Sequence, residues 1–499
     1  MRTIGTYCLL ACTLLALQST EAQTTARHRD RIAIVGAGAG GSSAAYWISR
    51  AKERFGLDVE IDVYEREGYI GGRSTTIYPY NDRSLQPLEL GASLFVEINK
   101  NLWRASEEFN LTRRPFREDQ PVLGIWDGSE VLLALEGNEQ DGAKVVGRYG
   151  LASIQKADGL ITAVVDKFLT LYSRRFPTWD TIFRLANRLG WVELISQTTD
   201  KYFRAAGVST RYTREFLEGS TRINYGQNVD FIHALEGACS QATDGATSIR
   251  GGNFQIFEQF LQRSKANVQL NTKVASITAR PFGSTNEWTV RTTSGRSQQY
   301  KAVILAAPFH TSGIALSPLL AARIPPQPYV HLHVTMLVTN SSTFNKAYFG
   351  LAPNASVPSL MLTSAEGIRR GRPGPEFNSI SYHGLVRPGE WAVKIFSDHR
   401  ISDATLQRIL PNSVRWVYRK EWDAYPKLPP TKTFPPVKLS KGLYYVNAFE
   451  PLISTMETET IASRNVVQLM LADDFSSSIC GPGATPPVSD DKFVLGWDC

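Results

Sequence analysis

A glycine-rich segment near the start of the chain has the composition of a phosphate-binding turn. Its residues are Gly36, Ala37, Gly38, Ala39, Gly40 and Gly41. In the spacing G-x-G-x-x-G, Gly36 allows a tight turn, Gly38 lets backbone amides approach a pyrophosphate, and Gly41 lets a following helix pack closely. The first N–H groups of such a helix carry a partial positive charge that attracts phosphate. The segment therefore predicts the binding of a dinucleotide.

The residues on either side of this turn can form the elements that position it. An apolar run, Ile32–Val35, precedes the turn, and a small-residue amphipathic segment, Ser42–Phe55, follows it. A second strand-like run, Val59–Tyr64, ends at Glu65, whose carboxylate is placed to accept hydrogen bonds from an adenosine ribose. A lone G-x-G-x-x-G is weak evidence, but a strand, a helix, a second strand and an acid in this order predict a βαβ unit.

A second turn indicates which dinucleotide is bound. Glu65 is followed by Arg66 and then by Gly71, Gly72 and Arg73. A nicotinamide-binding domain needs no second turn of this kind. FAD extends farther past the sheet, and an arginine beside a flexible turn can clamp its pyrophosphate. Since the chain has only one dinucleotide fingerprint, an NAD(P)-dependent reductase is less favoured, and we predict FAD as the cofactor.

Several later stretches are predicted to return to the cofactor. A small-residue turn at 91–93 leaves room for a flat ring, although tight packing explains it equally well. A helix expected over Ser454–Leu471 would point its N-terminus at the flavin and stabilise negative charge on the reduced ring. The residues predicted to contact FAD in the later stretches are Gly91, Ala92, Ser93, Val274, Ala306, Met456 and Glu457.

Composition limits the classes of protein that fit. The chain has 499 residues, of which 42% are hydrophobic and 20% are charged, as in ordinary globular proteins. This length is enough for about two to three domains. The formal net charge is +7, but Lys and Arg are scattered along the chain and form no basic stripe. We therefore expect no nucleic-acid partner.

Met1–Ala22 has the order of a secretory signal peptide. Arg2 supplies the positive end, Tyr7–Leu17 the apolar stretch, and Thr20–Ala22 a small-x-small cleavage site. An uncleaved anchor is the alternative, although the apolar stretch is short for a bilayer. Because no later run is long enough to span a membrane, we expect a lumenal or secreted protein. Three N-x-S/T sequons fit this route and lie at Asn110, Asn340 and Asn354.

Without the signal segment the chain keeps three cysteines, which allow at most one internal disulfide. Cys480 and Cys499 bracket a Gly/Pro-rich tail and are the favoured pair, so that Cys239 is expected to be a free, buried thiol. No Cys or His stands at the flavin-proximal turns. Noncovalent FAD is therefore expected, with attachment at Cys239 left open. No Cys/His spacing resembles a metal site, and none is predicted.

The pattern changes along the rest of the chain. Between Asn101 and Gln241 apolar residues recur at helical spacing, as in 161–172. Within this region 222–227 is a cluster of hydrogen-bonding groups, for which a structural polar turn is the alternative. Short strands recur from 331 to 418 and indicate a sheet-based second domain. The tail from Ala472 to Cys499 is expected to be a poorly ordered extension.

These patterns predict an α/β protein. A Rossmann-like FAD-binding domain is assembled from discontinuous segments and is joined to an α+β substrate domain with a helical insertion. We assign the signal peptide to 1–22, the FAD-binding domain to 30–110, 245–310 and 440–475, the substrate domain to 111–244 and 311–439, and the C-terminal tail to 476–499.

With these residues in view, the chain resembles the prenylcysteine oxidase (farnesylcysteine lyase) family of FAD-dependent amine-oxidase-like flavoproteins. The likeness extends from about Arg31 to Leu471. Its more specific marks are Arg222–Gln227 followed by Asp230, Gly251–Asn253, Trp422–Pro426 and the Met456–Glu457 helix start. Glu450–Ile453, with Pro451, and the Cys-terminated tail depart from the family pattern, and these departures concern the substrate more than the cofactor.

The resemblance implies an oxidase that cleaves the thioether of S-farnesyl- or S-geranylgeranylcysteine to cysteine, a prenyl aldehyde and hydrogen peroxide, with molecular oxygen as acceptor. It also implies a glycosylated protein of the lysosome or vacuole. An apolar tunnel would hold the isoprenoid and a polar mouth the amino acid, and Tyr225 and Gln227 are the candidates for catalytic residues. Two alternatives are a flavin oxidase of another lipophilic thioether, amine or secondary metabolite, and a non-catalytic flavin-fold binding protein. Peripheral contact with a membrane is left open.

Overall fold

The structure is a computed structural model that describes residues 29–116, 122–279, 288–480, 489 and 492–499. The expected signal segment, Met1–Ala22, lies outside the described residues. Among the described residues, no helix combines the length and apolarity needed to cross a membrane.

A six-stranded sheet forms the centre of the nucleotide-binding half. Its inner strands are parallel and buried on both faces, which is why their sequences are continuous apolar runs. The outermost pair is antiparallel. Across the sheet the order is β19 (Lys438–Ser440), β20 (Leu443–Tyr445), β13 (Ala302–Leu305), β1 (Asp30–Val35), β2 (Val59–Tyr64) and β9 (Asn267–Gln269).

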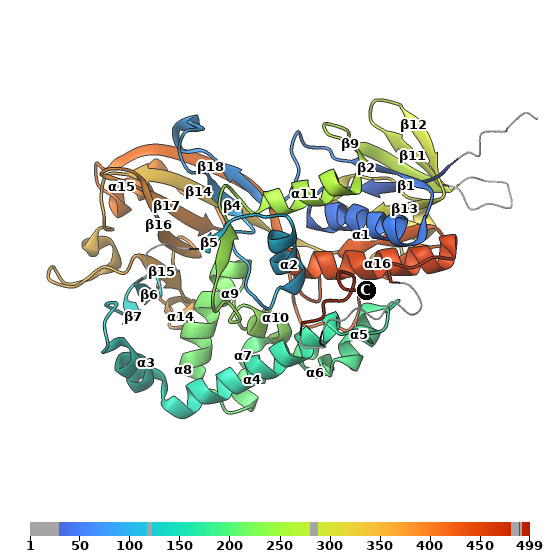
Figure 1. Cartoon of the computed structure of the whole chain (residues 1–499). Coiled ribbons are helices and arrows are strands. Elements are labelled where there is room, and N and C mark those ends of the chain that lie inside the picture. Colours follow the sequence, from blue (N-terminus) through green and yellow to red (C-terminus); the bar gives the residue numbers. More distant parts are fainter. Residues whose placement is uncertain (1–28, 117–121, 280–287, 481–488, 490–491) are drawn as a thin grey trace, which may run out of the picture.

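Three helices pack together beside this sheet. Helix α1 (Ala39–Phe55) contacts both α11 (Phe254–Ser264) and α16 (Met456–Phe475), and Figure 1 shows it lying between them. Helix α1 begins directly after Gly38, three residues before the predicted start at Ser42. Glycine weakens helix propensity, which favoured the later start. The glycines belong to the helix nevertheless, because they are needed here for close approach. The predicted α/β class and Rossmann-like unit are confirmed.

A seven-stranded, mainly antiparallel sheet forms the second half of the molecule. Its two longest strands, β14 and β18, pair along most of their length. Across the sheet the order is β18 (Val414–Pro426), β14 (Tyr329–Thr339), β17 (Glu390–Ser397), β16 (Ser379–Arg387), β15 (Leu360–Thr363), β6 (Leu123–Trp126) and β7 (Val131–Ala134). Between β13 and β14 the chain forms the short helices α12 (Phe309–Ser312) and α13 (Pro318–Ala321), and later come α14 (Glu366–Arg369) and α15 (Asp403–Ile409).

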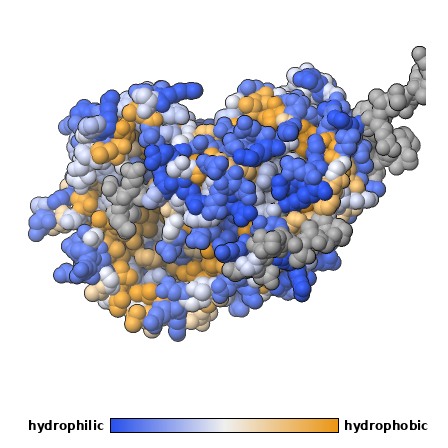
Figure 2. Space-filling model, viewed as in Figure 1, coloured by the Kyte–Doolittle hydropathy of each residue, from blue (hydrophilic) through white to orange (hydrophobic). Residues whose placement is uncertain are grey.

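Helices from 141 to 239 form the lower part of the molecule in Figure 1. In chain order they are α3 (Asp141–Tyr149), α4 (Leu151–Leu169), α5 (Ile182–Arg188), α6 (Val192–Ser196), α7 (Thr199–Ala205), α8 (Thr210–Tyr212), a π-helical turn (Thr213–Leu217), α9 (Glu218–Tyr225) and α10 (Ala234–Cys239). Figure 2 shows hydrophobic side chains gathered over this region. Val146 and Leu151, at the junction of α3 and α4, are both exposed.

Smaller elements connect the two halves. Helix α2 (Lys100–Glu108) packs on α16 and α11. The remaining small sheets are β10 (Val274–Ala279) with β11 (Trp288–Thr292) and β12 (Ser297–Tyr300), β3 (Thr75–Ile77) with β4 (Leu88–Gly91), and β5 (Arg113–Pro115) with β8 (Thr247–Ile249). The β5–β8 pair joins residues on opposite sides of the proposed division between the FAD-binding and substrate domains.

The structure decides the alternative left open for 222–227 and corrects one expectation. The polar cluster is not a turn: most of it is the end of α9, which stops at Gly226 in the left-handed conformation. The expectation of a poorly ordered C-terminal tail is wrong for 472–480 and 492–499, which the structure describes. Helix α16 continues to Phe475, and Trp497 is buried against Tyr46 and Trp47. The Arg54 guanidinium donates to the backbone carbonyls of Ile479, Gly496 and Trp497 at 2.9–3.0 Å.

Candidate active site

A cavity of about 740 Å³ extends from the glycine turn to the seven-stranded sheet. Residues of both large sheets and of helices α4, α9 and α16 line it. Its volume lies in the range of sites that enclose a cofactor or a drug-sized ligand. The two ends of the cavity differ in chemistry.

The first end is formed by backbone held at very close range. A Cβ atom on Gly41 would lie 1.8 Å from the carbonyl oxygen of Gly36, and one on Gly36 would lie 2.4 Å from that of Ala306. Gly36 also has a φ of +111°, which side chains rarely allow. The second glycine turn lies against the first, since Gly38 and Gly71 form a β-bridge. Only glycine fits at positions 36 and 41, and the resulting surface is a cradle of backbone.

Glu65 fixes the shape of this cradle. Its carboxylate is buried and accepts hydrogen bonds from the backbone N–H groups of Ala37 and Glu67 at 2.8 and 2.9 Å. Charge-assisted bonds of this kind are about twice as strong as neutral ones. Glu65 also lines the cavity, so the predicted acid at the end of β2 is present beside the turn.

Arg73 is held in place by a residue from the far end of the chain. Its guanidinium lies 2.5 Å from the buried carboxylate of Glu450 and donates to the Ala424 carbonyl oxygen at 2.8 Å. Tyr329 donates to the second carboxylate oxygen of Glu450 at 2.6 Å. Arg66, by contrast, is half exposed, and within the described part of the chain its ion pair is with its neighbour Glu67. Both arginines line the cavity, but only Arg73 is locked by packing.

The start of α16 faces the same end of the cavity. Thr455 caps the helix by accepting from the Thr458 backbone N–H at 3.0 Å. Met456 and Glu457 line the cavity, yet the Glu457 carboxylate is already bonded. It accepts from the N–H groups of Asn101 and Leu102 and so caps α2. Burial raises the pKa of Glu457 to about 7, and its carboxylate is a structural anchor.

Glu459 and Asn447 are buried at this end and have polar atoms left unsatisfied. Glu459 Oε1 and Asn447 Oδ1 have no hydrogen-bond partner among the residues that the structure describes, and both residues line the cavity. The other carboxylate oxygen of Glu459 lies 2.9 Å from where a Cβ of Gly40 would be. Burial, followed by repulsion from Glu450, raises the pKa of Glu459 to about 8. Unpaired buried polar atoms are costly, so they mark a place where a polar ligand fits.

The second end of the cavity is apolar on its helical side and polar on its sheet side. The apolar lining residues are Phe95, Ile98, Leu102, Phe116, Val164, Val165, Phe168 and Ile223. The polar lining residues are Asn224, Thr243, His331, Ser379, Ser381, His383, Lys394, Lys420, Glu421 and Asp423. Lys394 is buried and donates to the Glu89 carbonyl oxygen and to Ser93 Oγ at 2.8 and 2.9 Å.

The two candidate catalytic residues differ in their relation to the cavity. Tyr225 lines the cavity, and its pKa is raised well above the usual value by burial first and by Glu236 second. Gln227 does not line it. Its amide donates to the Pro426 carbonyl oxygen at 3.1 Å and accepts from the Leu428 N–H at 2.8 Å. Gln227 thus holds the end of β18 in place.

Most residues predicted to bind the cofactor meet in this cavity. Those that line it are Gly36, Gly38, Gly40, Glu65, Arg66, Gly72, Arg73, Ala92, Ser93, Val274, Ala306, Met456 and Glu457. Three do not: Ala37 and Gly41 shape the turn from behind, and Gly91 packs on Trp422, whose ring would be 2.7 Å from an added Cβ. Glu459, Asn447 and Lys394 were missed. The sequence held one signal for Glu459, which is an acidic residue within a helix that is expected to be buried.

The cysteines and sequons are also placed by the structure. Cys480 and Cys499 form a disulfide. The Cys239 thiol is free and lines the cavity, and burial raises its pKa well above the usual value, which keeps it protonated. All three sequon residues are exposed: Asn110, Asn340 and Asn354.

Comparison with known proteins gives consistent results. A family model described as prenylcysteine lyase matches residues 140–478, and one described as an NAD(P)-binding Rossmann-like domain matches residues 34–109. A farnesylcysteine lyase of Arabidopsis thaliana is 31% identical over 465 residues, covering 88% of each chain. Prenylcysteine oxidase 1 of Homo sapiens is 30% identical over 477 residues, again covering 88% of each chain.

Solved structures show the same fold at low sequence identity. A putrescine oxidase bound to putrescine matches with a TM-score of 0.60 and 15% identity, covering 89% of this chain and 99% of that one. A fatty acid isomerase from P. acnes matches with a TM-score of 0.60 and 12% identity over the same shares.

Proposed function

The chain belongs to the prenylcysteine lyase family, and from this premise we propose that it is an FAD-dependent oxidase that cleaves the thioether of S-farnesyl- or S-geranylgeranylcysteine. The overall reaction consumes the thioether, one O₂ and one water. It yields cysteine, a prenyl aldehyde and H₂O₂, so that two electrons leave the carbon next to sulfur and reduce oxygen. The relatives named farnesylcysteine lyase and prenylcysteine oxidase 1 support this choice of substrate.

The cofactor end of the cavity fits FAD. The backbone cradle at 36–41 and the start of α1 would hold the pyrophosphate, and Glu65 would face the adenosine ribose. The unsatisfied oxygens of Glu459 and Asn447 would accept hydrogen bonds from the ribityl hydroxyl groups. When bound, FAD supplies the oxidation as a hydride acceptor. Noncovalent binding is favoured because the Cys239 thiol is protonated and therefore a poor nucleophile.

The other end of the cavity fits a molecule that is apolar at one end and zwitterionic at the other. Val164, Val165 and Phe168 of α4 would bury the isoprenoid, which gains about 25 cal/mol for each Å² of apolar surface removed from water. Lys394 and Asp423, on the sheet side, offer opposite charges to a carboxylate and an ammonium group. This contrast between an apolar helix face and a charged sheet face within one cavity is the observation that carries the proposal.

We also propose where the protein acts. Exposed sequons at Asn110, Asn340 and Asn354 and the Cys480–Cys499 disulfide support passage through the secretory route to the lysosome or vacuole, or out of the cell. The exposed apolar residues Val146 and Leu151 support peripheral contact with a membrane, from which a lipophilic substrate would be drawn.

The test is a substrate panel read by peroxide release. The purified, flavin-containing protein is incubated with farnesylcysteine, geranylgeranylcysteine, a prenylated peptide and simple amines. We expect one H₂O₂ and one free thiol for each prenylcysteine consumed, and little turnover of the peptide. Turnover of an amine without turnover of either prenylcysteine would favour a flavin oxidase of another class. Absence of any flavin reduction under anaerobic conditions would favour a binding protein.

A further inference from the structure

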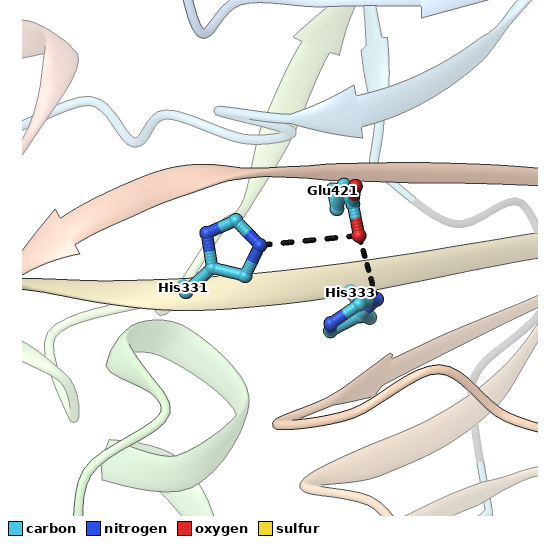
Figure 3. A group of neighbouring side chains, drawn as sticks. All are labelled: His331, His333 and Glu421. Carbon is cyan, nitrogen blue, oxygen red and sulfur yellow. Dashed lines mark ion pairs between the residues drawn. The ribbon is translucent and has the colours of Figure 1, made fainter.

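Two histidines and a glutamate converge at the rim of the cavity. His331 and His333 are two residues apart on β14, so both side chains lie on the same face of the sheet. The neighbouring strand β18 places Glu421 opposite His333 and Asp423 opposite His331. Figure 3 shows the three side chains meeting above the two strands, with Glu421 between the imidazoles.

The distances suit a metal ion. Glu421 Oε2 lies 3.9 Å from His331 Nε2 and 3.6 Å from His333 Nδ1. One ligand atom from each residue can be chosen so that all three lie within 4.8 Å of one another. Zinc bonds to histidine nitrogen and carboxylate oxygen are each about 2.0–2.2 Å long, so small rotations of these side chains bring the three atoms to bonding distance.

A fourth residue orients one of the imidazoles. His331 Nδ1 lies 3.1 Å from Asp423 Oδ1. When Nδ1 carries the proton and donates to this carboxylate, Nε2 keeps its lone pair and faces Glu421. Metal-binding histidines are usually oriented by a carboxylate or carbonyl in this way, and the partner also increases the basicity of the ligand.

We propose that His331, His333 and Glu421 bind one divalent transition-metal ion of the zinc class, with Asp423 as the orienting partner of His331. Two imidazoles with one carboxylate favour zinc and its neighbours over calcium or magnesium, which prefer all-oxygen sites. Three protein ligands leave a coordination position for water or another ligand. Since His331 and Glu421 also line the cavity, the ion would lie at its opening.

The sequence predicted no metal site, and the reason is geometric. His331-x-His333 is a short spacing that strands often carry by chance, and Glu421 lies far along the chain. Only the pairing of β14 with β18 brings the carboxylate between the two rings.

The test is calorimetric titration of the tag-free, flavin-loaded full chain with ZnCl₂ at neutral pH, after chelator treatment and dialysis. We expect one saturable site per chain and a zinc-dependent rise in melting temperature, because a ligand that binds only the folded state stabilises it. His333→Ala and Glu421→Gln should each weaken binding by roughly 100-fold or more. Asp423→Asn should weaken it by about 10- to 100-fold, as loss of an outer-shell partner does.

His310→Ala is the matched control, because His310 hydrogen-bonds backbone carbonyl oxygens of 324 and 325 and belongs to a different region. Its affinity for zinc should equal that of the unaltered chain. Flavin absorbance of each variant reports that it has folded, and Glu421→Gln is a conservative change at an exposed position. The absence of a saturable site, or equal zinc affinity in Glu421→Gln, would overturn the proposal. Either result would leave the proposed oxidase activity untouched.

Discussion

The two ends of the cavity are built by different means. At the cofactor end, backbone atoms form most of the surface. They come from a turn of six consecutive residues whose geometry needs glycine at 36 and 41. At the substrate end, side chains form the surface. They come from α4, α9, β14, β16, β17 and β18, which are far apart in the chain. A backbone site tolerates almost no substitution, whereas a side-chain site can change its preference one residue at a time.

The largest expected effect is at the cofactor end. Gly41→Val adds atoms where even a Cβ would lie 1.8 Å from the Gly36 carbonyl oxygen. We expect loss of bound flavin and of most folded protein. The measurement is flavin absorbance per mole of protein with the melting curve. A yellow, stable Gly41→Val protein would contradict the account of the cradle.

The next effect concerns the ion pair between Arg73 and Glu450 at the cofactor end of the cavity. Arg73→Met leaves the Glu450 carboxylate buried without its partner. Removing one member of a buried pair costs about 3–5 kcal/mol of unfolding free energy, and we expect the lower value because a third of the Arg73 side chain is exposed. Denaturant unfolding measures the change. Arg66→Met is the control and should change stability by about 0.5 kcal/mol or less, because its pair is exposed.

A substitution at the substrate end should separate substrate binding from cofactor binding. Val165→Asp places a charge on the apolar side of the cavity. If the proposed substrate is right, KM for farnesylcysteine should rise by roughly tenfold or more, because an apolar chain would meet a charged wall. Flavin content should not change. An unchanged KM would show that the isoprenoid does not lie against α4.

The buried acids predict how stability depends on pH. Burial raises the pKa of Glu236 and of Glu459 to about 8 each. A carboxyl whose folded pKa is raised binds its proton more tightly in the folded state. The stability it contributes is therefore full below about pH 4.5 and is lost as the pH rises toward about 8.

We expect the flavin-free protein to melt several degrees lower at pH 8 than at pH 5.5, as scanning calorimetry would measure. Glu459→Gln should flatten this dependence, since an amide does not titrate. A profile that rises with pH, or one identical in the variant, would count against these protonation states. This dependence suits an acidic compartment.

The smallest effect tests a glycine outside the cradle. Gly159 lies inside α4, and an added Cβ would meet nothing within 4 Å. Gly159→Ala should raise the free energy of unfolding by about 0.5–1 kcal/mol through helix propensity alone. Flavin content should stay the same. Destabilisation here would show that glycine is required at positions other than the cradle.

The same contrast explains what the sequence could predict. The strands and turn around 30–65 follow from neighbouring residues, and β2 has the predicted bounds, Val59–Tyr64. The substrate end follows from pairing between distant strands. Strands β6 and β7 were missed inside a region that reads as helical, and Gln227 faces the end of β18 because Leu428 and Pro426 reach it. The spacing of neighbouring residues does not predict such contacts.

The order of strands in the six-stranded sheet has a consequence for biosynthesis. Strand β1 leaves the ribosome early, but its neighbour β13 is made about 270 residues later, and β20 and α16 follow only near the end of the chain. At about 5–20 residues per second, the first βα unit waits on the order of tens of seconds for its partners. Its apolar strands are exposed for that time. The cofactor end of the cavity, which includes Asn447 and Glu459, is therefore complete only after α16 has been made.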